Sequence, residues 1–453
     1  MTWRNWAGNQ RTDPRRTVVA RDADEVVEAV KNAQRDGLRV KALGTGHSFT
    51  GIAVPEDVAL RPPSDPTLLR VDAATGLVTA PAGMPLHRLN VLLWERGFAL
   101  PNLGDIDAQT VAGAISTGTH GTGVTHQGLA AQVRGIEIVL ADGSLVTCSP
   151  TERPEIFSAA RIGLGALGVI TSVTLQALPA FRLHAVETAM PLDDVLDGLD
   201  ELVAGNEHFE FYWFPHTGIA ATKRNNRTEA TGPTRGRVAE WVGDDLLGNG
   251  AFELTCRLGA ALPTLVPRVN QLMARQMAAA EYVDRSYRVF TSPRRVRFLE
   301  MEYGIPRAAI HEALAGLRAA AERHGQAVTF PVEVRFAAAD DVPLSTATGR
   351  ESAYVAVHVY RGQPHEAYFG AVEAVMTALD GRPHWGKLHT QTAATLRERY
   401  PAFDDFVALR DRLDPEGRFT NAYLNRVLGA PGGAITSTRK ALPEDPAGPG
   451  PAQ

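Results

Sequence analysis

Two glycine-rich segments constrain this chain more than any other feature of its sequence. The first, Gly44-Thr45-Gly46-His47-Ser48, directly follows the apolar stretch 38–43. The second, residues 110–123, is built almost wholly from small and hydroxyl-bearing residues. Glycine lacks a Cβ atom and hydroxyl groups donate to anionic oxygens, so both segments are typical of loops in which backbone closely approaches a ligand.

Short helices and strands are predicted to alternate around these two segments, up to about residue 178. Apolar residues recur at helical spacing over 24–35, and a strand at 38–43 then runs into the first loop. The other elements that we expect here are helices at 85–96 and 156–164, and strands at 68–71, 77–80, 136–140, 145–148 and 169–175.

A different pattern begins after Pro179, with longer helices and strands. We expect an α+β chain, with one domain at 1–180 and a second α+β domain at 181–415 that covers the first. Residues 429–453 are rich in proline and glycine and are expected to be a disordered tail. The second domain is predicted to contain helices at 194–204, 260–280, 308–323 and 365–379, and strands at 208–214, 295–303, 327–336 and 353–360.

The composition narrows the class of protein. No apolar run reaches the roughly 18 residues of a membrane span, and the formal net charge of −5 argues against a nucleic-acid partner. The N-terminus lacks a secretory signal, and Cys148 and Cys256 lie far apart, which argues against a disulfide framework or a cysteine metal cluster. We therefore expect a cytoplasmic protein that acts on a small molecule, without a membrane span.

Three sequence patterns resemble known functional motifs, but the residues around them or the spacing within them do not fit. A Gly-x-Gly-x-x-Gly pattern at 163–168 fits a dinucleotide fingerprint, but the predicted helix precedes it and the strand follows, which is the reverse of that fold. Residues 46–50 have threonine where a serine-hydrolase elbow needs its second glycine. Two histidine pairs lack the spacing of helical metal ligands, so we expect no metal site. These pairs are His120 with His126 and His384 with His389.

The loop at 44–48 has two interpretations on its chemistry alone. The backbone N–H groups exposed by Gly44 and Gly46 can form a nest for a pyrophosphate, with the His47 ring close enough to reach an aromatic cofactor. A turn that happens to carry a histidine would explain the same residues equally well.

A family resemblance bears on this choice. Residues 42–53, Ala-Leu-Gly-Thr-Gly-His-Ser-Phe-Thr-Gly-Ile-Ala, resemble the flavin-attachment loop of the vanillyl-alcohol-oxidase superfamily, and more narrowly of its aldonolactone oxidoreductases and alditol oxidases. The resemblance covers roughly residues 3–428. It implies a PCMH-type FAD-binding domain of two α+β subdomains, a substrate domain, and a segment at 416–428 that returns to the flavin. The other motifs that carry it lie at 5–9, 118–123, 165–170, 384–387 and 419–421.

The resemblance implies that FAD is bound covalently, because the matching histidine of the family is joined to the 8α-methyl group of the flavin. His47 is that residue here. The other residues expected to bind the cofactor are Leu43, Gly44, Thr45, Gly46, Ser48, Gly104, Thr117, Gly118, His120, Gly121, Gly123 and Ile170.

The resemblance also implies a set of active-site residues. Glu333 and Arg335 match the Glu-x-Arg of the family, and their spacing places both on one face of a strand. Lys387, in His-Trp-Gly-Lys, matches a lysine that contacts the substrate hydroxyls, and His358 matches a substrate-contacting histidine. Without the resemblance, an ordinary ion pair for Glu333 with Arg335 would be the simpler interpretation.

Two departures from the alditol oxidases indicate the substrate. Asp105 and Tyr360 stand where those enzymes have a serine and a threonine in the polyol site, so we expect both to bind substrate and the substrate to be a lactone. Gly104 occupies a position where, in this superfamily, an alanine methyl can block dioxygen. Glycine there permits oxidase activity without requiring it.

The sequence therefore predicts a covalent FAD-dependent aldonolactone oxidase or dehydrogenase. We expect hydride transfer from the C2 hydroxyl carbon of an L-gulono-1,4-lactone or D-arabinono-1,4-lactone to flavin N5. Lys387 and Glu333 are expected to handle the proton and Arg335 to stabilise the reduced flavin. The electrons are expected to pass to O2, giving H2O2, or to a dye or cytochrome. Three alternatives are an oxidase of alditols such as xylitol or sorbitol, a flavin-bearing binding or redox-partner protein, and an NAD-dependent dehydrogenase.

Overall fold

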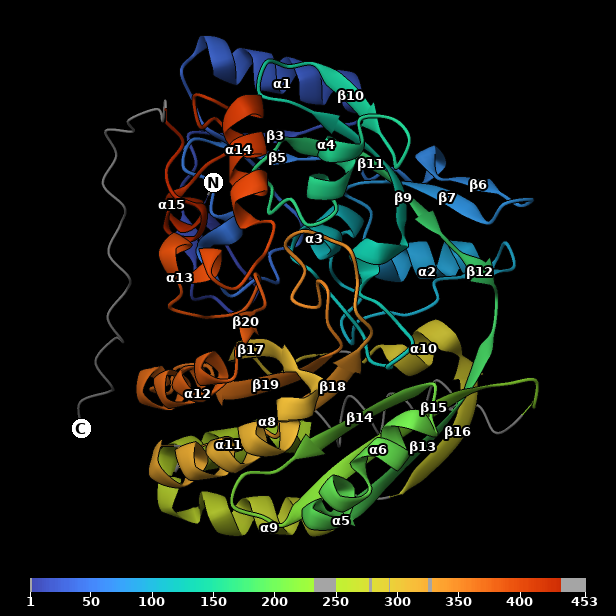
Figure 1. Cartoon of the computed structure of the whole chain (residues 1–453), viewed down its shortest axis with the longest axis vertical. Coiled ribbons are helices and arrows are strands. Elements are labelled where there is room, and N and C mark those ends of the chain that lie inside the picture. Colours follow the sequence, from blue (N-terminus) through green and yellow to red (C-terminus); the bar gives the residue numbers. More distant parts are fainter. Residues whose placement is uncertain (1, 232–249, 277–278, 293, 325–327, 433–453) are drawn as a thin grey trace.

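The computed structural model of the chain describes residues 2–231, 250–276, 279–292, 294–324 and 328–432 (Figure 1). One part, in the upper half of the view, combines the N-terminal elements with the C-terminal helices, and the other is dominated by one large sheet. This mixture of helices and sheets confirms the α+β class. None of the helices in the described ranges is both long and apolar enough to cross a membrane.

A small parallel sheet carries the first glycine-rich loop. Its strand order is β3 (Arg16–Val19), β5 (Val58–Arg61) and β4 (Val40–Ala42), and helix α1 (Ala23–Arg35) precedes β4 in the chain. The helix begins at the cap Asp22, whose side chain accepts from the N–H of Glu25. The expected strand at 38–43 is shorter than predicted, because the N–H of Leu38 still bonds to the helix at Ala33 O.

A five-stranded antiparallel sheet forms the rest of this part. Its order is β10 (Leu145–Cys148), β9 (Val133–Val139), β11 (Val169–Gln176), β7 (Leu77–Pro81) and β6 (Arg70–Asp72). Three helices accompany the sheet: α2 (Leu86–Trp94), α3 (Val111–Ser116) and α4 (Pro154–Ala160). Short strands pair β1 (Trp3–Arg4) with β2 (Arg11–Thr12), and β8 (Phe98–Ala99) with β12 (Leu178–Pro179).

The glycines at 163–168 join α4 to β11, in the order that argued against a dinucleotide fingerprint. The helix ends at Ala160, earlier than expected, and the chain turns through Leu164 and Gly165, which both have positive φ. A Cβ atom on Gly168 would lie 2.4 Å from Val139 O on the neighbouring strand. This glycine therefore serves close packing of the turn against β9.

The second part is built on one eight-stranded sheet. Its order is β16 (Ala280–Arg285), β13 (Arg182–Pro191), β15 (Ile219–Thr228), β14 (His208–Trp213), β18 (Val332–Ala337), β19 (Ser352–Tyr360), β17 (Phe298–Pro306) and β20 (Arg382–Pro383). Helices α5 (Leu192–Asp197), α6 (Leu199–Ala204), α11 (Ile310–His324) and α12 (Glu366–Ala378) contribute buried side chains to the core that packs against this sheet. Helix α10 (Ser286–Phe290) follows β16.

The single helix expected at 260–280 is wrong. The structure has α8 (Ala251–Ala261) and α9 (Val266–Gln276), separated by Leu262 and Pro263, and strand β16 already begins at Ala280. Proline lacks the N–H that would continue α8 and disfavours the helical conformation for the residue before it, and Leu262 has a φ of −134°.

The C-terminal helices pack with the N-terminal part. Helices α13 (Ala393–Arg397), α14 (Phe403–Leu413) and α15 (Ala422–Leu428) share one apolar core with β7, β9 and β11. The boundary that we expected at residue 415 therefore does not coincide with a change of core. Most of the tail expected at 429–453 lies outside the described residues, which end at 432.

Candidate active site

Three glycine-containing segments line a cavity, here called the first cavity, with about 870 Å³ of space that is partly open to solvent. Residues 41–48, 109–117 and 163–170 supply most of its lining. The loops come from the parallel sheet, from α3 and from the turn before β11, so three regions far apart in sequence meet here.

The loop at 44–48 presents unpaired backbone donors to the first cavity. The flanking N–H groups of Leu43 and Phe49 bond to Leu60 O and Gly386 O. Within the described residues, by contrast, the N–H groups of 44–48 make no hydrogen bond to protein. Gly46 has a φ of +78°, a conformation that favours glycine. A row of free N–H groups in such a turn suits the oxygens of a pyrophosphate.

The glycine at position 44 lets the loop pack closely against Thr110 at the first cavity. A Cβ atom on Gly44 would lie 2.7 Å from Thr110 Oγ1, so no larger residue fits without a shift. Lys41 also lines the cavity, and its Nζ donates to Gly165 O and Phe419 O, both at 3.1 Å. Burial lowers the pKa of Lys41 to about 7. Through Phe419, the segment 416–428 thus reaches the cavity wall.

His47 lies where the first cavity meets a second one. Its ring stacks on Trp6 with 5.5 Å between the ring centroids. Burial, with a smaller contribution from Lys387, lowers the pKa of His47 to about 4. The ring is therefore neutral near pH 7 and keeps a nitrogen lone pair, which the formation of a covalent bond requires.

The second cavity, of about 550 Å³, contains most of the charged groups of the site. It shares His47, Ser48, Gln109 and Thr117 with the first cavity. Its remaining lining includes Gly104, Asp105, His120, Glu302, Arg335, His384 and Lys387. A bound flavin dinucleotide would fit these features, with its phosphates in the first cavity and its ring system at the junction.

One face of the eight-stranded sheet presents polar side chains toward the second cavity. Glu333 and Arg335 stand two apart on β18. The neighbouring strand β19 places Ala356 opposite Glu333 and Tyr354 opposite Arg335. On β17, Glu300 lies opposite His358 of β19. Since residues two apart on a strand point the same way, the three strands together display a row of ionisable groups.

Arg335 is the centre of one buried ion-pair network. Its Nε donates to Glu210 Oε2 at 2.9 Å, and its guanidinium also pairs with Glu333 and lies 3.6 Å from Asp105 Oδ2. Arg294 approaches the same Asp105 oxygen at 2.6 Å. Burial alone would raise the pKa of Asp105, but these arginines and Lys387 bring it well below its usual value. Asp105 is therefore an anion near pH 7.

Lys387 is the centre of a second network. Its Nζ pairs with Glu300 and lies 4.0 Å from Glu302 Oε2. Burial would lower the pKa of Lys387, but the two carboxylates outweigh that effect and raise it. The lysine is therefore an ammonium ion near pH 7, and it cannot itself take a proton from a substrate hydroxyl without giving one up.

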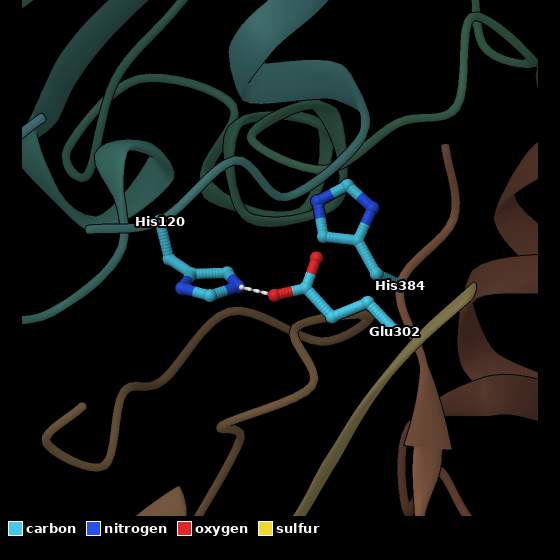
Figure 2. Close-up of side chains that lie close together, drawn as sticks. All are labelled: His120, Glu302 and His384. Carbon is cyan, nitrogen blue, oxygen red and sulfur yellow. Dashed lines mark ion pairs between the residues drawn. The ribbon is translucent and has the colours of Figure 1, made fainter. Parts of the chain in front are cut away.

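Two histidines converge on Glu302 (Figure 2). His120 Nε2 lies 3.0 Å from Glu302 Oε1, and His384 comes from the loop after β20. The N–H of Gly386 donates to His384 Nδ1, so the neutral ring carries its hydrogen on Nε2. Burial lowers the pKa of His384 to about 4. These three groups have metal-ligating atoms within 4.8 Å of one another. Lys387 supplies a positive charge beside them.

The two histidine pairs weighed from the sequence are arranged differently in the structure. His120 groups with His384 and Glu302, whereas His126 stacks on His208 with 4.5 Å between ring centroids. His389 Nε2 lies 2.9 Å from the hydroxyl of Tyr423.

The structure brings most of the expected site residues to the two cavities. The first cavity is lined by Leu43, Gly44, Thr45, Gly46, His47, Ser48, Thr117 and Ile170, and the second by Gly104, Asp105, His120, Arg335 and Lys387. Glu333 and His358 contact Arg335 and Glu300 rather than line the second cavity. The expected residues Gly118, Gly121 and Gly123 line neither cavity.

Tyr360, which we expected to bind the substrate, lies away from both cavities. It lines a separate surface hollow with Arg295, Arg297 and Arg361, and its hydroxyl donates to Glu253 at 2.6 Å. Tyr360 stands at the end of β19, two residues beyond His358, and its side chain does not reach the second cavity.

Sequence reasoning missed several charged residues of the site: Glu210, Arg294, Glu300 and Glu302. A signal for the last two was available. They stand two apart inside the strand predicted at 295–303, the same alternation that singled out Glu333 and Arg335. Arg294 carried no such signal, because it lies before the strand and reaches Asp105 only through the fold.

The fold and the two cavities define a class of protein, the flavin-dependent oxidoreductases with a PCMH-type FAD-binding domain. The FAD-binding domain profile matches residues 14–149, and FAD is the cofactor of this protein. Solved structures agree on the fold. A cholesterol oxidase from B. sterolicum superposes with a TM-score of 0.78 at 17% identity, over 94% of this chain and 96% of that one.

Within that class, the chain belongs to the D-arabinono-1,4-lactone oxidase family, whose profile matches residues 173–427. An L-gulono-1,4-lactone dehydrogenase of Mycobacterium tuberculosis is 45% identical over 94% of this chain and 99% of that protein. An L-gulonolactone oxidase of Bos taurus is 35% identical, with 94% and 98% covered. An alditol oxidase of a Streptomyces strain is 34% identical over the same two shares.

Proposed function

We propose that this enzyme oxidises the C2 hydroxyl carbon of an aldono-1,4-lactone, of the L-gulono or D-arabinono type, with FAD held at the junction of the two cavities. The observation that carries the proposal is the ion-pair network at the second cavity, in which the anionic Asp105 pairs with Arg294 and Arg335. The resemblance implies a neutral hydroxyl at this position in the polyol site of the alditol oxidases. The 45% identity to an L-gulono-1,4-lactone dehydrogenase supports the same substrate class.

The residues of the first cavity would hold the cofactor. The free N–H groups of 44–48 suit its phosphates, and His47 stands at the end of that loop, beside the second cavity. We propose that His47 forms the covalent tether, since its ring is buried, neutral and oriented by Trp6. When bound, FAD supplies the acceptor for the hydride that leaves the carbinol carbon.

Lys387 would bind the oxygen that is being oxidised. As an ammonium ion lining the second cavity, it donates a hydrogen bond to the substrate hydroxyl and stabilises negative charge that develops there. We expected Lys387 to accept the proton of the substrate hydroxyl. Because the lysine is already protonated, it can do so only by giving up a proton of its own. It can pass a proton on to Glu300, its direct partner, in the same step as it receives one.

Glu333 and Arg335 would act as a pair. Burial, partly offset by Arg335, raises the pKa of Glu333, which also accepts a hydrogen bond of 2.8 Å from the hydroxyl of Tyr212. Glu333 lies behind Arg335 and orients its guanidinium, which lines the cavity. Arg335 provides the fixed positive charge that would favour the reduced cofactor.

The decisive experiment is anaerobic mixing of the oxidised holoenzyme with a panel of aldono-1,4-lactones and alditols, followed by admission of air. Bleaching of the flavin absorbance by lactones, faster than by xylitol or sorbitol, is the expected result. Faster bleaching by alditols would favour an alditol oxidase, the alternative that the 34% identity to such an enzyme supports. No bleaching by either class would contradict the proposal.

The same experiment identifies the electron acceptor. Rapid return of the flavin colour on admission of air, with formation of H2O2, would establish an oxidase. A slow return in air but a fast return with a dye or a cytochrome would establish a dehydrogenase. We propose that dioxygen can reach the site, because residue 104, at the wall of the second cavity, is a glycine.

A further inference from the structure

Two buried carboxylates face Lys387 from one strand. Glu300 and Glu302 stand two apart on β17, so their side chains leave the same face, and they are only 4% and 5% exposed. Glu300 pairs directly with the lysine, and Glu302 lies 4.0 Å from its Nζ. Two ionised carboxylates beside a lysine in a buried site fix the position of its Nζ atom and also keep the amine protonated.

Each glutamate is backed by a histidine. His358 Nε2 lies 3.5 Å from Glu300 Oε1, and His120 Nε2 lies 3.0 Å from Glu302 Oε1. The Nδ1 atoms of the two rings face backbone carbonyl oxygens, of Pro331 and Gly121. A carbonyl oxygen only accepts, so Nδ1 of each ring carries a hydrogen. Each ring therefore presents its Nε2 atom to the glutamate beside it.

His120 itself has little freedom. Its ring stacks on Tyr354 with 3.5 Å between centroids, and it is 5% exposed. His120 therefore fixes Glu302 from the side opposite Lys387, and the Glu302 carboxylate lines the second cavity together with the lysine. This arrangement gives His120 a role that its place in the glycine-rich segment did not suggest.

We propose that Glu302 and His120 are positioning residues that hold Lys387 as an ammonium ion directed into the second cavity. The inference rests on the proposed function, because the lysine is useful in that state only if an oxygen of the substrate develops negative charge beside it. Glu300 serves as the direct partner of Lys387, and Glu302 with His120 prevents the lysine from turning away. The other ionisable groups that face Lys387 are His47, Asp105, His358 and His384.

The first test measures the ionisation of Lys387 in the oxidised holoenzyme without substrate. Trace acetylation with acetic anhydride at a series of pH values, read by peptide mass spectrometry, reports the fraction of free amine. In Glu302→Gln we expect the pKa of Lys387 to fall, with an ionisation constant changed about tenfold, because a nearby negative charge is lost. An unchanged Lys387 in this variant would overturn the proposal.

A matched control separates this effect from the general cost of losing a buried carboxylate. Glu373 is also 5% exposed and accepts hydrogen bonds from Tyr303, Thr390 and Gln391, outside both cavities. Glu373→Gln should lower the thermal stability without moving the ionisation of Lys387. A shift as large as that in Glu302→Gln would mean that the pairing with Lys387 is not the cause.

The role of His120 is tested by a double-mutant cycle on the free energy of unfolding of the holoenzyme. If His120 acts through Glu302, then His120→Gln, Glu302→Gln and the double variant will be strongly non-additive. Additive effects would contradict a positioning pair. In parallel, the alkaline limb of the pH profile of kcat/KM should move to lower pH in Glu302→Gln, whereas a merely structural role would lower activity evenly at all pH values.

These measurements fail separately from the proposed function. The labelling of Lys387 needs no substrate. A shifted pKa of Lys387 in Glu302→Gln, combined with no bleaching of the flavin by lactones, would contradict only the substrate assignment. Bleaching by lactones combined with an unmoved Lys387 would overturn only the positioning pair.

Discussion

Among single residues, His47 is central to the proposed binding of the cofactor. It belongs to both cavities, and its neutral ring is held by Trp6 at the junction. The sequence chemistry alone allowed either a turn residue or a cofactor ligand. The row of free N–H groups beside it and the shared walls of the two cavities support the second interpretation.

The tether at His47 can be tested without knowledge of the substrate. Acid precipitation of the wild-type protein should leave the yellow chromophore on the protein, and His47→Ala should release it into the supernatant. Trp6→Phe, which keeps a ring against His47, is a suitable control and should retain the chromophore. Free FAD from the acid-treated wild type would show that the cofactor is bound without a covalent bond.

Gly104 has a packing role that complicates its role toward dioxygen. A Cβ atom on Gly104 would lie 2.9 Å from Thr119 Cγ2 and 3.2 Å from His120 O. Gly104→Ala should therefore lower the free energy of unfolding by about 1–3 kcal/mol, in addition to slowing the reoxidation of the flavin in air. Thr119→Ser removes the clashing methyl group, so the double variant should recover stability. If the double variant also recovers fast reoxidation, the effect of the alanine was distortion rather than a block to dioxygen.

At the scale of elements, the joint between α4 and β11 depends on glycine. Gly168→Ala would drive a Cβ atom to 2.4 Å from Val139 O, a backbone atom that cannot move without disturbing the sheet. We expect a loss of roughly 2–4 kcal/mol in the free energy of unfolding. Gly370→Ala is the matched control, because that glycine is exposed within α12 with open space around its Cβ position. It should stabilise by about 0.5–1 kcal/mol. Denaturant unfolding of both variants measures the difference.

The elements also show where sequence patterns succeed. Helix α1 and strands β11, β14 and β19 lie within a residue or two of the predicted bounds, because each combines a clear apolar period with a cap or a turn residue. The helix expected at 260–280 failed at Pro263, whose effect on the chain should have outweighed the apolar period. Strand β17 was predicted, but its two inward glutamates were not recognised.

At the scale of the whole molecule, buried histidines couple stability to pH. Burial lowers the pKa of His208 and of His389 to about 3 each. The unfolded chain protonates these rings near pH 6.5, so the unfolded state binds more protons and stability falls as the pH decreases from about 6.5 toward 3. At pH 5 each ring should cost roughly 2 kcal/mol relative to neutral pH.

Urea unfolding at several pH values tests this coupling. We expect the free energy of unfolding to fall between neutral pH and pH 5 and the slope to be flatter in His208→Gln, which has no ring to protonate. His184→Gln is a control, since that histidine is about one-third exposed and paired with Glu281 on the surface. A slope unchanged by His208→Gln would show that this ring does not set the acid sensitivity.

The sequence by itself determined the class of fold, the cofactor and most of the residues around the two cavities. These features reside in short local patterns: glycines where backbone must approach a ligand, alternation along strands, and motifs shared with a family. Tertiary structure decided what such patterns do not contain. Arg294, Glu210 and the pair of Glu302 with His120 reach the site from distant segments. The charge state of Lys387 depends on which carboxylates the fold buries beside it, and only the packed molecule determines that.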